Sequence, residues 1–167
     1  GHTQAEFEDI LTAHEVGYKH ATHFYNAMPG FHKRREYKYE GTVESIYLID
    51  DMTVEIVADG IHVPPTILRL VYKIKGVERT CLVTDSLACT ATDSKTAFDP
   101  RVIIEDGVCK LSDRSALAGS IARPLIICVS IVFRYLRILK KFVCSIYVMI
   151  SVKWCTAGSA HLPPSTI

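Results

Sequence analysis

The chain has 167 residues, 49% of them hydrophobic, which is enough to build one domain around a sizeable core. Its formal net charge of +1 lacks the strong positive excess of most nucleic-acid-binding proteins, so we expect no nucleic-acid partner. The charge is nevertheless uneven along the chain. Residues 1–122 contain all 18 acidic residues, whereas residues 123–167 contain six Lys and Arg and no acid. These two parts read as different kinds of sequence, and we treat 1–122 as the domain and 123–167 as an anomalous tail.

The six cysteines are scattered and form no CxxC pair, which is typical of proteins from a reducing compartment. The N-terminal stretch GHTQAEFED has neither the basic nor the apolar region of a signal peptide. We therefore expect a cytoplasmic protein.

The first elements are a helix and a short strand. Thr3 and Glu6 have the spacing of a capping box, helical periodicity follows, and Gly17 can end the helix in a left-handed conformation. A strand is expected over Lys19–Phe24. The charged segment Pro29–Glu40 reads as an exposed loop or a short helix.

The next elements alternate in type. Met52–Ala58 is rich in β-branched residues and predicts a strand, and the helix expected over Thr66–Ile74 starts after a Pro-Pro pair. Arg79–Thr84 predicts another strand, which stops at Asp85. Such alternation of strands and helices favours an α/β fold with a parallel sheet.

A different unit follows. Val102–Glu105 and Val108–Leu111 flank an Asp-Gly pair, which predicts a β-hairpin with a two-residue turn. The segment Ala116–Ser120 consists of small residues around one leucine and reads as a loop.

Polar residues cluster where the expected strands end. His23 and Asp85 lie at strand ends, His62 follows the strand Met52–Ala58, and His2 precedes the first helix. In parallel α/β folds the carboxyl ends of the strands converge on one face, and that face holds the site. His2 and His23 are about one helix and one strand apart, so we expect their side chains to lie side by side.

Two adjacent imidazoles are suitable ligands for zinc or iron, although a catalytic zinc takes three protein ligands and the local pattern offers no third. A single histidine, taken alone, is more often a structural polar residue than a ligand, and we assign the structural role to His20. Asp85 could act as a general base, or it could be a turn former after its strand. His62 could hydrogen-bond a substrate. Arg34 and Arg35 could bind a phosphate group or form a solvated charged surface.

Five motifs in order, GHTQA, ATHFYNAM, ADGIHVPP, LVTDS and LAGS, resemble those of the N-acetylglucosamine-6-phosphate deacetylases of the amidohydrolase superfamily. The resemblance extends from Gly1 to about Ala122. It implies the later strands and helices of a (β/α)8 TIM-type barrel, carrying a small β-hairpin insertion. It also implies a hydrolase that converts N-acetylglucosamine 6-phosphate to glucosamine 6-phosphate and acetate, in amino-sugar catabolism.

The resemblance assigns roles to individual residues. It makes His2 and His23 metal ligands, with zinc as the expected divalent metal and iron as the alternative, and Asp85 the catalytic acid and base. The remaining matches are residues expected to contact the substrate: Asn26, Ala27, Arg35, His62 and Leu117. In the family the arginine often comes from the partner subunit of a homodimer, so Arg35 implies such a dimer.

The chain also departs from the family pattern. The third metal ligand of the family is a glutamate upstream of the GHT motif, and the sequence begins at that motif. We therefore expect an incomplete chain that is weakly active or inactive. In residues 123–167 neither acids nor family motifs occur, which suggests a shifted reading frame. An interfacial membrane helix is the rival interpretation, but the apolar runs are shorter than the roughly 18–20 residues that span a bilayer.

Two alternatives to the deacetylase remain open. One is another amidohydrolase acting on a different amide. The other is a non-catalytic fragment that binds metal or associates with itself.

Overall fold

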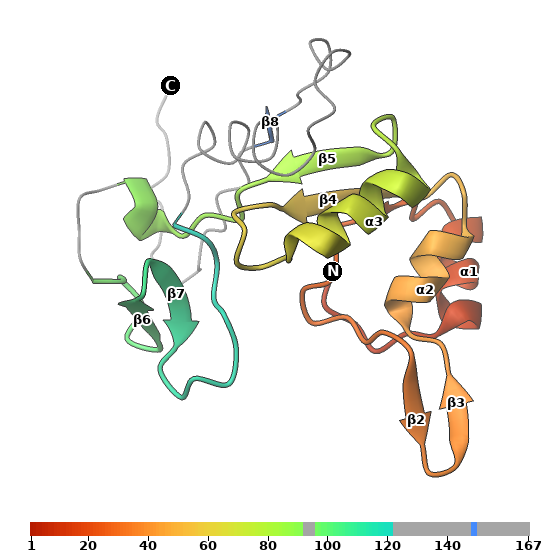
Figure 1. Cartoon of the computed structure of the whole chain (residues 1–167), viewed down its shortest axis with the longest axis horizontal. Helices are drawn as coiled ribbons and strands as arrows, with labels where there is room; N and C mark the ends of the chain where they lie inside the picture. Colours follow the sequence, from red (N-terminus) through yellow and green to blue (C-terminus); the bar gives the residue numbers. More distant parts are fainter. Residues whose placement is uncertain (92–95, 122–147, 150–167) are drawn as a thin grey trace, which may run out of the picture.

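A four-stranded parallel sheet is the central element of this computed structural model, which describes residues 1–91 and 96–121 and the backbone of 148–149. The strand order is β1-β4-β5-β8, and each neighbouring pair is parallel. The strands are β1 (His20–Ala21), β4 (Thr53–Val57), β5 (Thr80–Val83) and β8 (Val148–Met149). This arrangement confirms the predicted α/β class with a parallel sheet (Figure 1).

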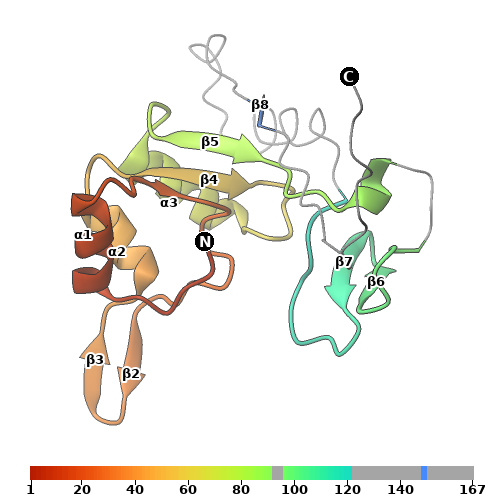
Figure 2. The ribbon, with the colours of Figure 1, turned by 180° about the vertical axis from the view of Figure 1, so that it is seen from behind.

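Within the described residues, three α-helices accompany the sheet. Helix α3 (Pro65–Lys75) covers one face of β4, and the opposite face is turned toward the viewer in Figure 2. The proline at its first position has no backbone N–H, but an N–H at that position would have no partner within the helix. Proline is therefore favourable there, which is why the Pro-Pro pair marks the start of α3. Helices α1 (Phe7–Glu15) and α2 (Thr42–Leu48) pack against each other beside the sheet. The predicted strands over β4 and β5 and the helix over α3 are thereby confirmed.

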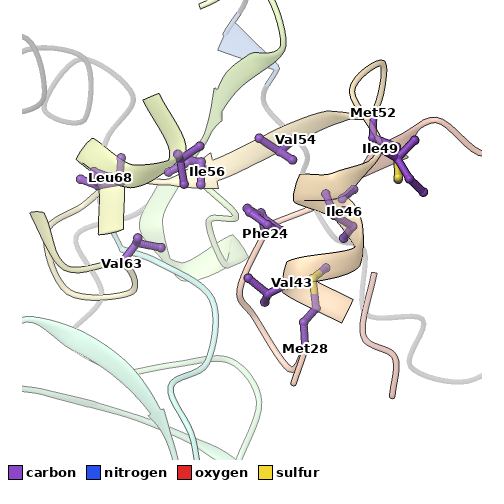
Figure 3. Close-up of a cluster of buried hydrophobic side chains, with 13 residues drawn as sticks. Phe24, Met28, Val43, Ile46, Ile49, Met52, Val54, Ile56, Val63 and Leu68 are labelled. Carbon is purple, nitrogen blue, oxygen red and sulfur yellow. The ribbon is translucent and has the colours of Figure 1, made fainter. Parts of the chain in front are cut away.

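The core lies between the sheet and these helices (Figure 3). Val54 and Ile56 alternate along β4 and point to the same side as Leu68 of α3, because successive side chains of a strand face opposite ways. Phe24, which follows β1, and Ile46 of α2 fill the other end of the cluster. All five side chains are buried. The segment after β1 is therefore held in place by the core itself.

The predicted hairpin is present as β6 (Val102–Glu105) and β7 (Val108–Leu111). Asp106 and Gly107 both have positive φ, as the expected two-residue turn requires. A short 3-10 helix, η1 (Ala88–Ala91), lies between β5 and the hairpin. The loop after β7 returns to the sheet, where Ser120 forms a bridge with Ser86 just after β5.

The charged segment Pro29–Glu40 was predicted wrongly. It forms an antiparallel hairpin, β2 (His32–Arg34) and β3 (Tyr37–Tyr39), which projects away from the sheet (Figure 1). The alternation that normally identifies a strand is absent because most of its side chains are exposed. Contacts between side chains hold it instead, since the Arg34 guanidinium lies 3.8 Å from the centre of the Tyr39 ring and pairs with Glu6.

Two further expectations need correction. The capping box starts at Glu6 rather than Thr3: the Glu6 N–H donates to Asp9 Oδ2 over 3.2 Å, whereas Thr3 Oγ1 accepts from the Ala5 N–H. The strand expected over Lys19–Phe24 is reduced to the two residues of β1. Gly17 does follow α1 with a positive φ, as expected.

The predicted boundary at residue 122 and the anomalous tail 123–167 lie outside the described residues, apart from β8. Within the part of the chain that the structure describes, no helix is both long and apolar enough to span a bilayer.

Candidate metal and hydrolase site

Three neighbouring strands deliver polar side chains to one edge of the sheet. β1, β4 and β5 run parallel, and each is followed two residues after its end by a titratable residue: His23, Asp59 and Asp85 respectively. Because the carboxyl ends of parallel strands share one edge, these residues gather there. The strand-end clustering expected from the sequence is thus present.

His2 and His23 lie in contact. Their ring centroids are 4.7 Å apart and the rings are tilted by 40°. His23 is buried, whereas His2 is exposed. The Thr3 N–H donates to the carbonyl of Ala27 over 3.2 Å, which fixes the N-terminal segment beside the turn that follows β1. The predicted proximity of the two histidines is therefore confirmed.

The donor chemistry of this pair suits a divalent metal. Two imidazoles side by side, one of them buried, match the ligand type that zinc and iron take from proteins. Within residues 1–91 and 96–121, no third His, Cys, Asp or Glu completes a cluster of three with them. The described residues therefore supply part of a ligand set.

The turn after β1 has an unusual backbone. His23, Tyr25 and Ala27 all have positive φ, a conformation that side chains disfavour and that concentrates at functional sites. The Asn26 N–H donates to the His23 carbonyl over 2.9 Å, closing the turn, and the Phe24 N–H donates to the Glu55 carbonyl over 2.8 Å. Asn26 and Ala27 thus lie directly beside the histidine pair.

Asp85 also has a positive φ, and the loop after β7 holds it. The Ser120 N–H donates to the Asp85 carbonyl over 2.9 Å. A Cβ atom added at Gly119 would lie 2.5 Å from that same carbonyl oxygen, so glycine is required for the loop to approach so closely. Leu117 is in the same loop and is 38% exposed.

His62 is held on both sides of its ring. Its Nδ1 is 2.6 Å from Asp59 Oδ2, and its Nε2 is 2.9 Å from the Ala118 carbonyl oxygen. Burial alone would lower the pKa of His62, but the hydrogen bonds to Asp59 and Ala118 outweigh it, and the pKa is raised. The pKa of Asp59 is lowered, because its hydrogen bonds with His62 and Ile61 outweigh the effect of burial. A substrate that bonds this ring must therefore displace Ala118.

Arg35 is not brought to this edge. It lies exposed in the turn of the β2–β3 hairpin, which projects from the sheet (Figure 1). Its neighbour Arg34 pairs with Glu6 instead.

Sequence reasoning missed Asp59. The signal was present in the ADGIH motif, where Asp59 precedes His62 by three residues, within reach of the hydrogen bond found here. Sequence reasoning also missed a cluster on the face of the sheet opposite α3. There, donor atoms of His20, Glu55 and Cys81 lie within 4.8 Å of one another. That cluster comes from three strands, so no local motif could have shown it.

Known proteins resemble most of the chain. It is 33% identical over 124 residues to the N-acetylglucosamine-6-phosphate deacetylase of Bacillus subtilis (strain 168), covering 74% of this chain and 30% of that protein. It is 30% identical over 122 residues to the N-acetylgalactosamine-6-phosphate deacetylase of Shewanella sp. (strain ANA-3), covering 72% of this chain and 30% of that protein. No family model matches the chain.

Solved structures agree. The N-acetylglucosamine-6-phosphate deacetylase of Thermotoga maritima matches with a TM-score of 0.64 and 35% identity, over 73% of this chain and 33% of that one. A variant of the Mycobacterium smegmatis deacetylase, solved with N-acetyl-D-glucosamine-6-phosphate, matches with a TM-score of 0.67 and 29% identity, over 76% of this chain and 33% of that one.

The parallel sheet makes this an α/β protein, and the relatives that it matches are deacetylases, which are hydrolases. The matched three quarters belongs to the family of N-acetylglucosamine-6-phosphate deacetylases. The chain spans about a third of the length of the relatives it matches.

Proposed function

We propose that residues 1–122 form part of the active site of a metal-dependent deacetylase acting on N-acetylglucosamine 6-phosphate. The observation that carries this proposal is the contact between His2 and buried His23 at the edge where the strand of Asp85 also ends. The reaction is hydrolysis of the acetamide, which yields glucosamine 6-phosphate and acetate. The names of the relatives support this substrate.

His2 and His23 would hold the metal, together with the upstream glutamate that the resemblance to the family implies. Zinc or iron bound there would supply Lewis-acid polarisation of the acetamide carbonyl.

The other residues at this edge act on the substrate and its protons. Asp85 would take a proton from the attacking water at its carboxylate and then give it to the nitrogen of the leaving amine. Asn26 and Ala27, in the turn beside the histidines, would hold the sugar phosphate. His62 would hydrogen-bond the substrate, and Leu117 would line the pocket for the acyl group.

The architecture belongs to the same proposal. The parallel sheet with its intervening helices would be the later part of a (β/α)8 barrel, with β6–β7 as its small β insertion. Arg35, exposed on the projecting hairpin, would reach the phosphate of a partner subunit in a homodimer rather than that of its own chain. The scattered cysteines favour a cytoplasmic location.

A chimera tests the proposal. Residues 1–121 would replace the matching segment of the Bacillus subtilis deacetylase, and acetate release from N-acetylglucosamine 6-phosphate would be measured with added zinc. We expect activity that falls about a hundredfold or more with Asp85→Asn, because general acid–base catalysis is lost. Asp113→Asn, in an exposed turn, is the matched control and should leave the rate unchanged. Equal rates for the chimera and its Asp85→Asn variant would contradict the assignment.

A second substrate follows from the Shewanella relative, which is named for the galactosamine compound. The two sugars differ in the orientation of one hydroxyl group. The same chimera should release acetate more slowly from N-acetylgalactosamine 6-phosphate than from N-acetylglucosamine 6-phosphate. A faster rate with the galactosamine compound would make that compound the preferred substrate instead.

The 167-residue chain alone should release little or no acetate, because it spans about a third of the relatives' length. Turnover near that of a full-length relative would contradict this expectation. Metal analysis of His2→Ala and His23→Ala variants distinguishes metal ligands from residues with a structural role only. If the histidines bind the metal, each variant should contain less of it, whereas purely structural histidines would leave the metal content unchanged.

A further inference from the structure

We propose that His20, Glu55 and Cys81 form a second, sulfur-containing zinc site, separate from the His2–His23 pair. The side chains come from three adjacent parallel strands, and their donor atoms all lie within 4.8 Å of one another. This proposal goes beyond the deacetylase activity and does not depend on it.

Sheet register brings the three residues together. Glu55 of β4 pairs with Cys81 of β5, and His20 of β1 pairs with Thr53, two residues before Glu55. Residues two apart on a strand, and residues paired across parallel strands, share one face. Val54 and Ile56 face α3 in the core, so Glu55 and its partners lie on the opposite face, the one turned toward the viewer in Figure 2.

The hydrogen bonds around His20 direct one of its ring nitrogens at the carboxylate. Thr53 Oγ1 donates to the Lys19 carbonyl over 3.2 Å, which leaves it to accept from His20 Nδ1 over 2.7 Å. A neutral ring held in this way presents the lone pair of Nε2, and this atom is 3.1 Å from Glu55 Oε1. Two acceptors that face each other need a proton or a cation between them. A hydrogen bond from the other ring nitrogen is also how proteins orient histidines that bind metals.

The donor set selects the metal. One nitrogen, one oxygen and one sulfur suit zinc, and thiolate disfavours magnesium and calcium. Bonds of about 2.0–2.3 Å to a tetrahedral zinc place ligand atoms about 3.5 Å apart, so small side-chain rotations would complete the geometry. The Glu55 side chain is 10% exposed and that of His20 40%, so an ion can enter from the side of β1.

Cys81 would change its protonation on binding. Burial, and secondarily the charge of Glu55, raise the pKa of this thiol, and Sγ donates to the Val54 carbonyl over 3.4 Å. Zinc would displace the thiol proton to solvent, so binding would release a proton and strengthen as pH rises.

Cobalt titration of the full 167-residue chain tests the proposal. Co²⁺ replaces zinc, and a cobalt–thiolate bond gives a near-ultraviolet charge-transfer band, which His2, His23 and Asp85 cannot produce because they carry no sulfur. We expect the band in the wild type, its loss in Cys81→Ser, and its retention in Cys89→Ser and His2→Ala. Added zinc should abolish it by displacing cobalt.

Glu55→Gln provides a near-isosteric check if Cys81→Ser does not fold. It should weaken cobalt binding about tenfold or more with an unchanged circular dichroism spectrum. His14→Gln, at a histidine bonded to Asp51 instead, should bind cobalt as the wild type does. A wild-type chain without the band at saturating cobalt would overturn the proposal, leaving a His20–Glu55 ion pair. A band that persists unchanged in Cys81→Ser would overturn it too. Neither result would affect the deacetylase proposal, which uses other ligands.

Discussion

The buried pair of Asp59 and His62 connects the end of β4 to the loop after β7. Their side chains are 6% and 2% exposed, and Ser120 Oγ also donates to Asp59 Oδ2 over 3.3 Å. The structure therefore stabilises the ionised forms of both residues, and this has a definite pH dependence. Because the pKa of His62 is raised, its protonated form contributes to the stability of the fold. This contribution is fully present below the pKa of a free histidine and is lost as pH rises through the raised pKa. Because the pKa of Asp59 is lowered, its ionised form also contributes to stability. This contribution is fully present above the pKa of a free aspartate and is lost as pH falls through the lowered pKa.

We therefore expect Asp59→Asn to lower the free energy of unfolding by about 2 kcal/mol between these limits, because it weakens a hydrogen bond between charged groups. The loss should be larger at a pH below the pKa of a free histidine than at a pH above the raised pKa of His62, where its charge is lost. Urea denaturation at the two pH values measures it. The His62 ring signals in NMR should titrate at lower pH in the variant, and an unchanged titration would contradict the pairing.

Gly119 is the second residue-scale test. A methyl group there would lie 2.5 Å from the Asp85 carbonyl oxygen and 3.1 Å from the Leu87 side chain, so Gly119→Ala must push the loop away from β5. We expect a loss of about 1–3 kcal/mol in the free energy of unfolding, measured by thermal or urea denaturation. Gly30→Ala is the matched control, because its nearest contact is an ordinary 3.4 Å to Glu44. Equal effects of the two changes would mean that the loop does not pack on Asp85.

At the scale of the elements, α3 shows how the sheet is covered. Leu68 is buried at 6% exposure against the sheet, while Leu70, on the same helix, is 40% exposed. Leu68→Ala should therefore lower the free energy of unfolding by about 3 kcal/mol through lost burial and a cavity. Leu70→Ala should cost less than about 1 kcal/mol. Urea denaturation of both variants measures the two losses in free energy of unfolding. Similar losses would contradict the packing of Leu68, rather than Leu70, against the sheet.

The elements also show what the sequence could predict. β4, α3, β5 and the β6–β7 hairpin were predictable because each carries a signal within its own residues, such as β-branched runs, a proline start or an Asp-Gly turn. Helix α2 was not anticipated, since it has seven residues and its cap is the Gly41 N–H donating to Glu44. The β2–β3 hairpin was missed because it has no apolar face; its cross-strand contact is that of the Arg34 guanidinium with the Tyr39 ring.

The same reasoning applies to the candidate site. The contact of His2 with His23 was predictable, because spacing along the chain and parallel topology together determine which strand ends meet. Asp59 was missed although its spacing to His62 is a local signal. The loop closure at Gly119 was not predictable, because it depends on a contact with Asp85, 34 residues earlier in the chain. The roles of the site residues stay predictions.

At the scale of the whole molecule, the projecting hairpin exposes apolar surface. Phe31, just before β2, and Tyr37, at the start of β3, are each 63% exposed, on the element that also carries Arg35. Aromatic residues are enriched at the interfaces between proteins. We expect the chain to associate with itself through this hairpin.

Sedimentation velocity tests that expectation. The double variant Phe31→Ser and Tyr37→Ser should shift the distribution toward monomer without loss of secondary structure. Phe98→Ser, at a residue 64% exposed before β6, is the control and should leave association unchanged. A wild-type chain that stays monomeric at all accessible concentrations would contradict the expectation.

The left-handed backbone at His23, Tyr25 and Ala27 has a consequence for the order of folding. An isolated chain seldom adopts three such residues within five, so local preference works against this turn. Its hydrogen bond to β4 and the burial of Phe24 must already be in place to hold it. We therefore expect the histidine pair to form late, after β1 has docked on β4, so that an early folding intermediate would have a sheet but not yet the contact between His2 and His23.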